Sequence, residues 1–526
     1  MVVCGVSGRR RHAAAALAID GRLVAAAEQS PLSRTLDSDV RSHRLPMAAI
    51  DACLSAAGLT GRDISYVIRA EGYAVTLEHS EATRPLHEFG GKAVRGRRIS
   101  RLAAYAQLAK AAGARAVLVA DGPAAMFVTS SAELIDLGRI RGLLALTCRL
   151  AAQLGLAHDD SAGALAALEQ LAAGAGSNGH DWFEALSSPN DGGAEDEAEF
   201  DRALADAAAE AGAPLGDVTA PLVRRERVVA GVANAFLQVV ARHIGELAAA
   251  HGPEVMLSGA VFGSPDLVSR VRRVAGQAYA VAPCPSTPAA ALGAALAYGS
   301  PVPEAVPADL ALGPLVSEAD AKAVLENCRL DYIYEPRWPR LLERVSRVLE
   351  RGKLVAWFQG RAEFGHPFVG SRSFLCDPSH RYARDNINVF LLRRALPAPI
   401  PLSFAPDRGD CVDISAMSPL TLTRAAVGAE WRDRVRACLD GQGYAHAHVA
   451  RDGAGPLADL LALHDRRTGV PGLANLPLCG PDDVAAVSPR DAIRAAYASS
   501  ADALVIHRFI VMKDYWQMRD EAPAQS

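Results

Sequence analysis

Short apolar runs alternate with amphipathic segments along most of the chain. The first lie at residues 2–7 and 13–19, and Asp20-Gly21 predicts a tight turn into a third run over 23–28. This spacing predicts a β-hairpin unit at the N-terminus. Further strands are expected at 66–70, 116–120, 255–257, 278–281, 354–358 and 503–511.

Helices are expected where apolar residues recur every three or four positions. These segments are 46–59, 225–250, 266–275, 288–298 and 339–351. Strands that alternate with helices predict α/β domains, whose ligands bind at the carboxyl ends of strands. The Pro-rich stretch 300–307 divides the chain. We therefore expect domains over 1–300 and 316–526, joined by a linker over 301–315. The acidic stretch 180–206 predicts a surface insertion, and no internal repeat of about 20–50 residues is visible.

Composition narrows the classes of partner. The 526 residues contain 55 Lys plus Arg and 59 Asp plus Glu, a net charge of −4, so bulk charge favours neither nucleic acid nor an anionic membrane. No apolar run reaches the ~18–20 residues that span a bilayer, and the N-terminal charges follow the apolar run, unlike a signal peptide. Nine scattered cysteines without a CxxC pair favour a reduced, cytoplasmic protein without a cysteine-built zinc site.

Three stretches carry a resemblance to a known family. In chain order they are GVSGRRRHAAAALAIDGRLVAAAEQ, WFQGRAEFGHPFVGSRSFLCDP and RRTGVPGLANLPLCGPDDVAAVSPRDA. Together they resemble the ATP-dependent O-carbamoyltransferases of antibiotic and nodulation-factor biosynthesis, whose hallmark loop reads GRMEFGPRALGNRSILADP. The order and spacing agree over nearly the whole chain.

The resemblance implies an actin-like (Kae1-like) N-terminal domain and a YrdC-like C-terminal α/β domain. The C-terminal domain would form carbamoyl adenylate from carbamoyl phosphate and ATP, with Mg. The N-terminal domain would pass the carbamoyl group to a small-molecule acceptor, beside an iron held by two histidines and an aspartate.

The family's metal-ligand positions fall on Arg97, Arg101 and Thr287. A guanidinium has no acceptor lone pair, so we expect no iron in this protein. At i and i+4, Arg97 and Arg101 would share a helix face. They either clamp an anionic group near Ser258, Gly259 and Thr287, or form a solvated basic face.

The resemblance also assigns the nucleotide contacts. Pro367 stands where the family has an arginine, and Leu392 where it has a lysine, so one phosphate donor of the loop is lost. The retained candidates for binding ATP are Arg361, Glu363, Gly370, Arg372, Ser373, Asn388, Arg394 and Asn475.

Three residues are candidates for catalysis. His12 lies within a residue of the family's functional histidine and is the candidate base, or a structural histidine. Asp121 either orients a substrate hydroxyl or caps the next turn. His446 and His448 form an HxH pair on one face of a strand, which suits acid–base chemistry or a metal, while exposed or hydrogen-bonded structural histidines are the favoured alternative.

Three functional hypotheses follow. The first is a carbamoyltransferase of natural-product metabolism that acts on a hydroxyl or amine. The second is a catalytically degenerate paralogue that serves as a partner or regulator in a biosynthetic complex, and the third is another ATP-dependent condensing enzyme. The expected partners are a small-molecule acceptor and a homo-oligomer or biosynthetic partner, without nucleic acid or membrane.

Overall fold

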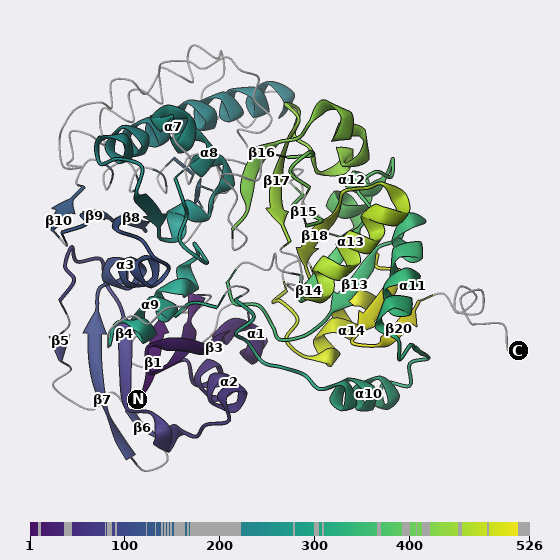
Figure 1. Cartoon of the computed structure of the whole chain (residues 1–526), viewed down its shortest axis with the longest axis horizontal. Helices are drawn as coiled ribbons and strands as arrows, with labels where there is room; N and C mark the ends of the chain where they lie inside the picture. Colours follow the sequence, from purple (N-terminus) through teal and green to yellow (C-terminus); the bar gives the residue numbers. More distant parts are fainter. Residues whose placement is uncertain are drawn as a thin grey trace, which may run out of the picture.

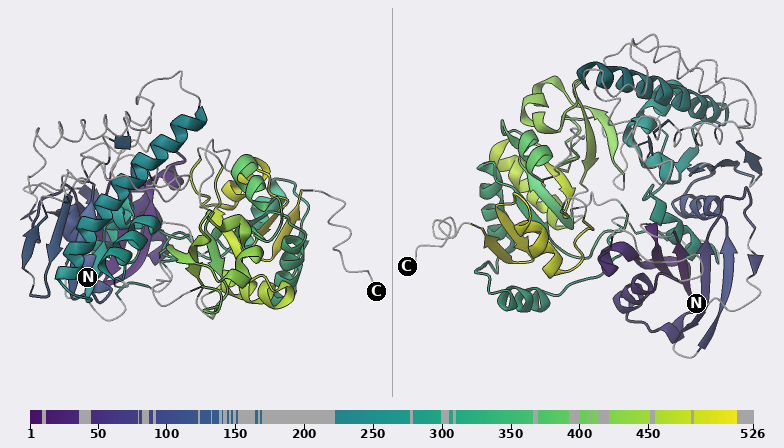
Figure 2. Two further views of the ribbon diagram at one scale, coloured as in Figure 1. Left: turned by 90° about the horizontal axis from the view of Figure 1, so that it is seen from above. Right: turned by 180° about the vertical axis from the view of Figure 1, so that it is seen from behind.

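The computed structural model describes most of the chain, and it places an N-terminal and a C-terminal part side by side (Figures 1 and 2). The described residues are 1–8, 12–35, 45–78, 80–81, 87–89, 92–122, 124–131, 133–137, 140, 144, 147, 150–151, 164–165, 168, 222–276, 279–298, 305–307, 310–365, 370–391, 400–406, 408–412, 421–450, 455–480 and 483–513.

The first sheet has the strand order β3-β2-β1-β4-β7-β5, with β6 paired to β7. Strand β1 is antiparallel to β2 and parallel to β4, and β4 is parallel to β7. The strands are β1 (Val2–Ser7), β2 (Ala14–Ile19), β3 (Arg22–Glu28), β4 (Tyr66–Ala70), β5 (Ser80–Glu81), β6 (His87–Phe89) and β7 (Lys92–Ile99). Helices α1 (Gln29–Ser33) and α2 (Met47–Ala57) follow β3.

The second sheet repeats this topology in the order β10-β9-β8-β11. Strand β8 is antiparallel to β9 and parallel to β11, and a parallel bridge from Leu257 to Val281 continues the sheet. The strands are β8 (Ala116–Asp121), β9 (Ala124–Val128), β10 (Leu134–Asp136) and β11 (Val255–Ser258). The N-terminal part therefore contains two halves of the same strand order, a duplication that the sequence did not reveal.

Two helices exchange between the halves. Helix α3 (Arg101–Ala111) follows the first sheet but packs on β8, and α9 (Ala290–Leu296) follows the second sheet but packs on β1. Glycines permit this close contact. A Cβ at Gly5 would lie 2.2 Å from the Ala291 carbonyl oxygen, and one at Gly293 would lie 1.8 Å from that of Ala104. The helix pair thus brings the carboxyl ends of β1, β4, β8 and β11 to one region. Helices α7 (Leu222–Ala250) and α8 (Pro265–Ala275) pack together on the second half.

The C-terminal part is built on a nine-stranded mixed sheet in the order β12-β20-β19-β13-β14-β18-β15-β17-β16. Helices α11 and α13 contribute to the core on one face, and α10 and α14 to the core on the other. The strands are β12 (Ile333–Tyr334), β13 (Val355–Phe358), β14 (Arg372–Cys376), β15 (Leu402–Phe404), β16 (Thr423–Ala426), β17 (Tyr444–Val449), β18 (Gly472–Pro477), β19 (Ala503–Ile506) and β20 (Phe509–Met512). The helices are α10 (Glu318–Asn327), α11 (Trp338–Glu350), α12 (Ala383–Asp385), α13 (Pro456–Thr468) and α14 (Pro489–Tyr497).

The mixed α/β class predicted from the sequence is confirmed, while the YrdC-like assignment and the domain boundaries stay predictions. The single strand expected over 503–511 is wrong. His507 takes a φ of +48°, which reverses the chain and splits the segment into the hairpin β19–β20. The strand expected at 278–281 is reduced to the bridge at Val281, and the expected insertion over 180–206 lies outside the described residues. Within the part of the chain that is described, no helix is long and apolar enough to cross a bilayer.

Candidate functional site

A buried ion pair joins the two halves of the N-terminal part. Arg101 is the first residue of α3, and the N-cap Ser100 side chain of that helix accepts a hydrogen bond from the Ala103 amide (3.0 Å). The Arg101 Nε donates to Oδ2 of Asp121, the last residue of β8, over 2.6 Å. Arg101 is 7% exposed and Asp121 2%. Burial disfavours the charged form of Arg101, but the Asp121 carboxylate outweighs burial and raises the pKa of the guanidinium.

Tyr105 extends this pair to the start of α9. Its hydroxyl lies 2.9 Å from the Ser286 carbonyl oxygen and 3.2 Å from that of Thr287. The Arg101 Nη2 also donates to the Thr287 carbonyl (3.4 Å). Burial raises the pKa of Tyr105 well above its usual value, so the phenol stays a neutral donor.

Two further predicted residues lie at the same point. The Ser258 hydroxyl, at the end of β11, donates to the Tyr105 carbonyl oxygen (3.0 Å). Gly259 has a φ of +107°, and a Cβ there would lie 2.1 Å from the Ala120 carbonyl oxygen. The structure therefore gathers Arg101, Asp121, Ser258, Gly259 and Thr287 around the carboxyl ends of β8 and β11.

Arg97 does not belong to this group. It lies on β7, where its guanidinium packs against the rings of Tyr66 (5.7 Å to the centroid) and Tyr298 (4.8 Å). The prediction that Arg97 and Arg101 share a helix face is wrong, because β7 extends to Ile99 and α3 begins only at Arg101. The clamp of two guanidinium groups therefore does not form.

The hallmark loop contacts the N-terminal part directly. The Arg361 Nε donates to the Gly313 carbonyl (3.0 Å), and its Nη2 donates to the carbonyls of Leu312 (2.8 Å) and Val24 of β3 (3.3 Å). The Gly313 amide in turn donates to the Ala362 carbonyl (2.8 Å). Arg361, expected on phosphate, thus holds the loop to the linker and to β3.

The Phe364-Gly365 segment of this loop reaches both halves of the N-terminal part. Glu28, the last residue of β3, accepts a hydrogen bond from the Gly365 amide (3.1 Å). The Cys284 thiol donates to the Phe364 carbonyl (3.7 Å). Gly365 has a φ of +83°, and a Cβ there would lie 2.1 Å from the Cys284 sulfur. Burial raises the pKa of Glu28 to about 7, although the Gly365 amide opposes this shift.

The second arginine of the loop, Arg372, is also held by the backbone. Arg372 is 2% exposed; its Nη1 donates to the Gln359 carbonyl (2.6 Å) and its Nη2 to that of Gly360 (3.0 Å). Its guanidinium lies 3.6 Å from the centroid of the Phe358 ring. Burial lowers the pKa of Arg372 to about 9. Glu363 accepts a hydrogen bond from the Ser371 amide, which closes the turn.

The remaining nucleotide candidates are spread over the C-terminal sheet. The Asn475 amide donates to the Ser403 hydroxyl (2.9 Å). Within the described residues, the buried Ser373 hydroxyl and the side-chain amide oxygen (Oδ1) of Asn388 have no hydrogen-bond partner. Gly370 has a φ of +89° and packs against Leu457. Arg394, Pro367 and Leu392 lie outside the described residues.

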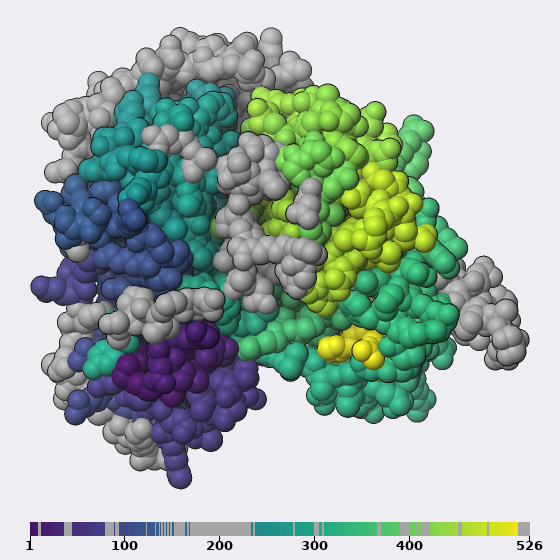
Figure 3. All heavy atoms as spheres, in the orientation of Figure 1, coloured from purple at the N-terminus to yellow at the C-terminus, as the bar shows by residue number. Residues whose placement is uncertain are grey.

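His446 is part of a contact between the two parts of the chain. Its Nε2 lies 3.2 Å from Oδ2 of Asp266 in the first turn of α8, and Arg424 Nε lies 2.8 Å from Oδ1 of the same carboxylate. Burial alone would raise the pKa of Asp266. The hydrogen bond from His446 and the nearby positive charges of His446 and Arg424 outweigh burial, so the pKa of Asp266 is lowered. Strand β16 contacts α8. Figure 3 shows teal atoms of the N-terminal part beside light-green atoms of the C-terminal part near the top of the molecule. His448 is buried, and His12 is partly exposed beside Gly8. No hydrogen bond between described residues joins His12, Asp121 and His446.

Sequence reasoning missed Glu28, Tyr105 and Asp266. Each lies at the end of a strand or in the first two turns of a helix, but only the tertiary contacts distinguish it from other such residues.

Sequence reasoning also missed a buried Ser–His–Asp arrangement in the C-terminal part. His464 Nδ1 lies 3.0 Å from the Ser346 hydroxyl, and its Nε2 lies 3.2 Å from Asp377. All three residues are at most 2% exposed, so a substrate does not reach this arrangement.

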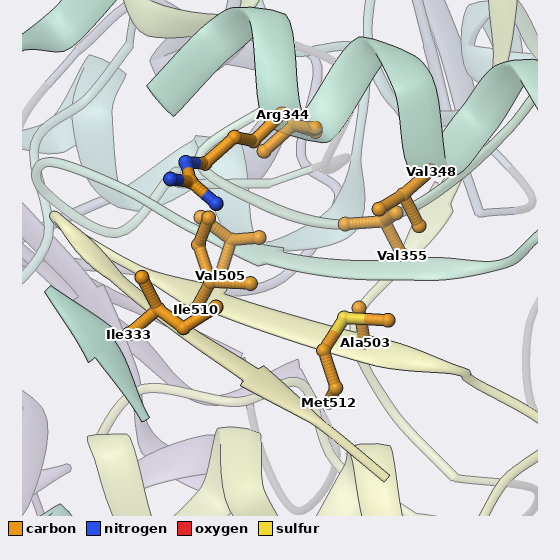
Figure 4. Close-up of a pocket in the computed structure, with 9 residues that line it drawn as sticks. Ile333, Arg344, Val348, Val355, Ala503, Val505, Ile510 and Met512 are labelled. Atoms are coloured by element: carbon orange, nitrogen blue, oxygen red, sulfur yellow. The ribbon is translucent and has the colours of Figure 1, made fainter. Parts of the chain in front are cut away.

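A small hollow under α11 is apolar (Figure 4). Arg344 lies at one side, with its Nε 3.5 Å from Glu335. The lining residues are Ile333, Arg344, Val345, Val348, Val355, Ala503, Val505, Ile510 and Met512. The hollow belongs to the core between α11 and the sheet and offers no group for catalysis.

Comparison with known proteins identifies the class of the C-terminal part. Residues 346–513 match the family described as Carbamoyltransferase C-terminus. Nodulation protein U of Azorhizobium caulinodans is 30% identical over 135 residues, which cover 26% of this chain and 24% of that protein. Nodulation protein NolO of Bradyrhizobium diazoefficiens is 26% identical over 246 residues, 44% of each chain. The family resemblance inferred from the sequence is confirmed. The chain spans less than half the length of these relatives.

Two solved structures align with the chain more loosely. The activator of the 2-hydroxyisocaproyl-CoA dehydratase from Clostridium difficile, with bound ADPNP, is 15% identical and covers 56% of this chain and 93% of its own, with a TM-score of 0.35. Component A of the Acidaminococcus fermentans (R)-2-hydroxyglutaryl-CoA dehydratase also has a TM-score of 0.35 at 15% identity, over 56% of this chain and 96% of its own. Superpositions at this level assign neither ligand nor activity.

Proposed function

We propose that the protein transfers a carbamoyl group, activated with ATP as an adenylate, to a hydroxyl or amine of a small-molecule acceptor. The C-terminal family match supports carbamoyl transfer. The structural observation that carries the proposal is the contact of the hallmark loop with the strand ends of the N-terminal part, through Gly365, Glu28 and Cys284. This contact puts a loop of the C-terminal part next to the gathered polar residues of the N-terminal part.

The roles of the residues follow from this arrangement. An acceptor hydroxyl or amine loses a proton when it attacks the carbamoyl carbon, and AMP leaves with the electron pair of the broken acyl–phosphate bond. Glu28, with a pKa of about 7, and His12 are candidate proton acceptors at the same end of the first sheet. Mg would neutralise charge on the phosphates of ATP.

The test is carbamoyl-phosphate-dependent release of pyrophosphate, because formation of an adenylate displaces pyrophosphate from ATP. We expect release with the full chain, and weaker release in the absence of carbamoyl phosphate. Pyrophosphate release that is independent of carbamoyl phosphate would contradict the donor and favour another ATP-dependent condensation.

A degenerate paralogue is the second candidate, and one observation favours it. Arg361 and Arg372 both donate to backbone carbonyls instead of facing an open site. If calorimetry detects no binding of ATP and no pyrophosphate is released, the protein acts as a partner or regulator and not as a transferase.

A further inference from the structure

The residues at the family's metal-ligand positions do not fit a metal. Arg101 carries a guanidinium without an acceptor lone pair, and the Thr287 carbonyl accepts from Arg101. The nearest carboxylate, Asp121, is engaged by the Arg101 Nε at 2.6 Å. A cation is nevertheless present at this point, because the guanidinium itself carries the positive charge.

The duplication of the N-terminal part shows how this cation is held. In the first half, the Ser7 hydroxyl at the end of β1 donates to the Pro288 carbonyl at the start of α9 (3.1 Å). In the second half, Asp121 at the end of β8 accepts from Arg101 at the start of α3. The two contacts are topological counterparts. One is neutral and the other is an ion pair, so the strand ends differ in charge at this one position.

The hydrogen bonds of Arg101 leave part of its guanidinium available. Its Nε donates to Asp121, and its Nη2 donates to the Thr287 carbonyl (3.4 Å) and faces the Tyr105 hydroxyl (3.4 Å). Among the residues that the structure describes, Nη1 has no hydrogen-bond partner, and 8% of the side chain remains exposed. The Asp121 carboxylate fixes the plane of the guanidinium and therefore the direction of Nη1.

We propose that Arg101, oriented by Asp121, is the resident cation of this site and binds an anionic oxygen of a phosphate-class ligand through Nη1, in place of a metal ion. The identity of that ligand as carbamoyl phosphate or a phosphorylated acceptor rests on the proposed function, but the anion site does not. Asp121 is a positioning residue in this arrangement.

The experiment is calorimetric titration of the full chain with inorganic phosphate and, separately, with carbamoyl phosphate. The test variant is Arg101→Gln/Asp121→Asn, which removes both charges and keeps a polar side chain at each position. The matched control is Arg115→Gln/Glu254→Gln, which removes an exposed pair joined over 2.9 Å elsewhere in the N-terminal part. Loss of a hydrogen bond to a charged group predicts about tenfold or weaker affinity for phosphate in the test variant only.

Two results would overturn the proposal. One is phosphate affinity that is absent in the wild-type chain or unchanged in the test variant. The other is tight binding of one Fe(II) per chain in a parallel anaerobic titration that Thr287→Ala abolishes. Should the double variant fail to fold, Arg101→Lys replaces it. A lysine ammonium can pair with Asp121 but lacks the Nη1 group that the proposal assigns to the anion. That variant is expected to keep the fold and to lose phosphate affinity, and unchanged affinity would count against the proposal. Phosphate binding without pyrophosphate release would contradict the proposed function alone.

Discussion

The Nε of Arg424 on β16 lies 2.8 Å from Oδ1 of Asp266 on α8, across the boundary between the two parts of the chain. The side chains are 10% and 16% exposed, and the Arg424 Nη2 also bonds to Asp440. His446 approaches the other oxygen of Asp266. The predicted catalytic histidine therefore lies in a charged contact between the N-terminal and C-terminal parts of the chain.

Asp266→Asn is expected to loosen this contact. Removing one partner of a largely buried pair leaves Arg424 with less compensation, at a cost of about 1–3 kcal/mol. Urea unfolding and limited proteolysis would measure the change. Because the folded-state pKa of Asp266 is lowered, its contribution is present above its unfolded pKa and is lost as pH falls through the folded pKa. Equal stability of Asp266→Asn and wild type at pH 7 would contradict the role of this pair.

Asp121→Asn is expected to destabilise the protein more than the loss of an exposed ion pair does. It leaves the buried guanidinium of Arg101 uncompensated, which costs about 3–5 kcal/mol in comparable cases. Arg115→Gln, which breaks the exposed pair with Glu254, is expected to cost only ~0–1 kcal/mol. Denaturant midpoints of both variants give the comparison, and similar losses would show that Arg101 and Asp121 are not energetically coupled.

The raised pKa of Glu28 predicts that the stability of the protein depends on pH between about pH 4.5 and pH 7. Its folded pKa is raised to about 7, so its stabilising contribution is complete below the unfolded pKa and is lost as pH rises through the folded pKa. The full difference is about 3 kcal/mol at one pKa unit per 1.36 kcal/mol. Glu28→Gln keeps an acceptor for the Gly365 amide and is expected to gain stability relative to wild type as pH rises from 5 to 8. Glu254→Gln is the control, and a parallel pH profile for Glu28→Gln and wild type would refute the assignment.

Gly365→Ala is expected to detach the hallmark loop from the N-terminal part. The added Cβ would lie 2.1 Å from the Cys284 sulfur, and the φ of +83° strains any other residue. Overpacking and the left-handed backbone together predict a loss of about 2–4 kcal/mol. The double variant Gly365→Ala/Cys284→Ala removes the clash but not the backbone strain. It is therefore expected to recover part of the stability, as measured by thermal unfolding. A double variant no more stable than Gly365→Ala would show that the sulfur is not the obstacle.

The sequence by itself determined the α/β class, several helices and strands to within a few residues, and the carbamoyltransferase resemblance. Hydrophobic periodicity and short motifs are local properties, and they specify local elements such as β1, α8 and α11. Three short motifs in the same order along the chain were sufficient to suggest the family, and residues 346–513 match its C-terminal domain.

Only the tertiary structure decided which polar residues meet. Arg97 and Arg101 are four residues apart, yet a strand end between them sends one to Tyr66 and Tyr298 and the other to Asp121. Arg361 and Arg372 were expected on phosphate because they match arginines of the family's hallmark loop. Their partners are backbone carbonyls. Every residue has one, so the sequence does not indicate which carbonyl will accept. Contacts between distant segments depend on how the two halves and the C-terminal sheet pack, and packing is a property of the folded chain as a whole.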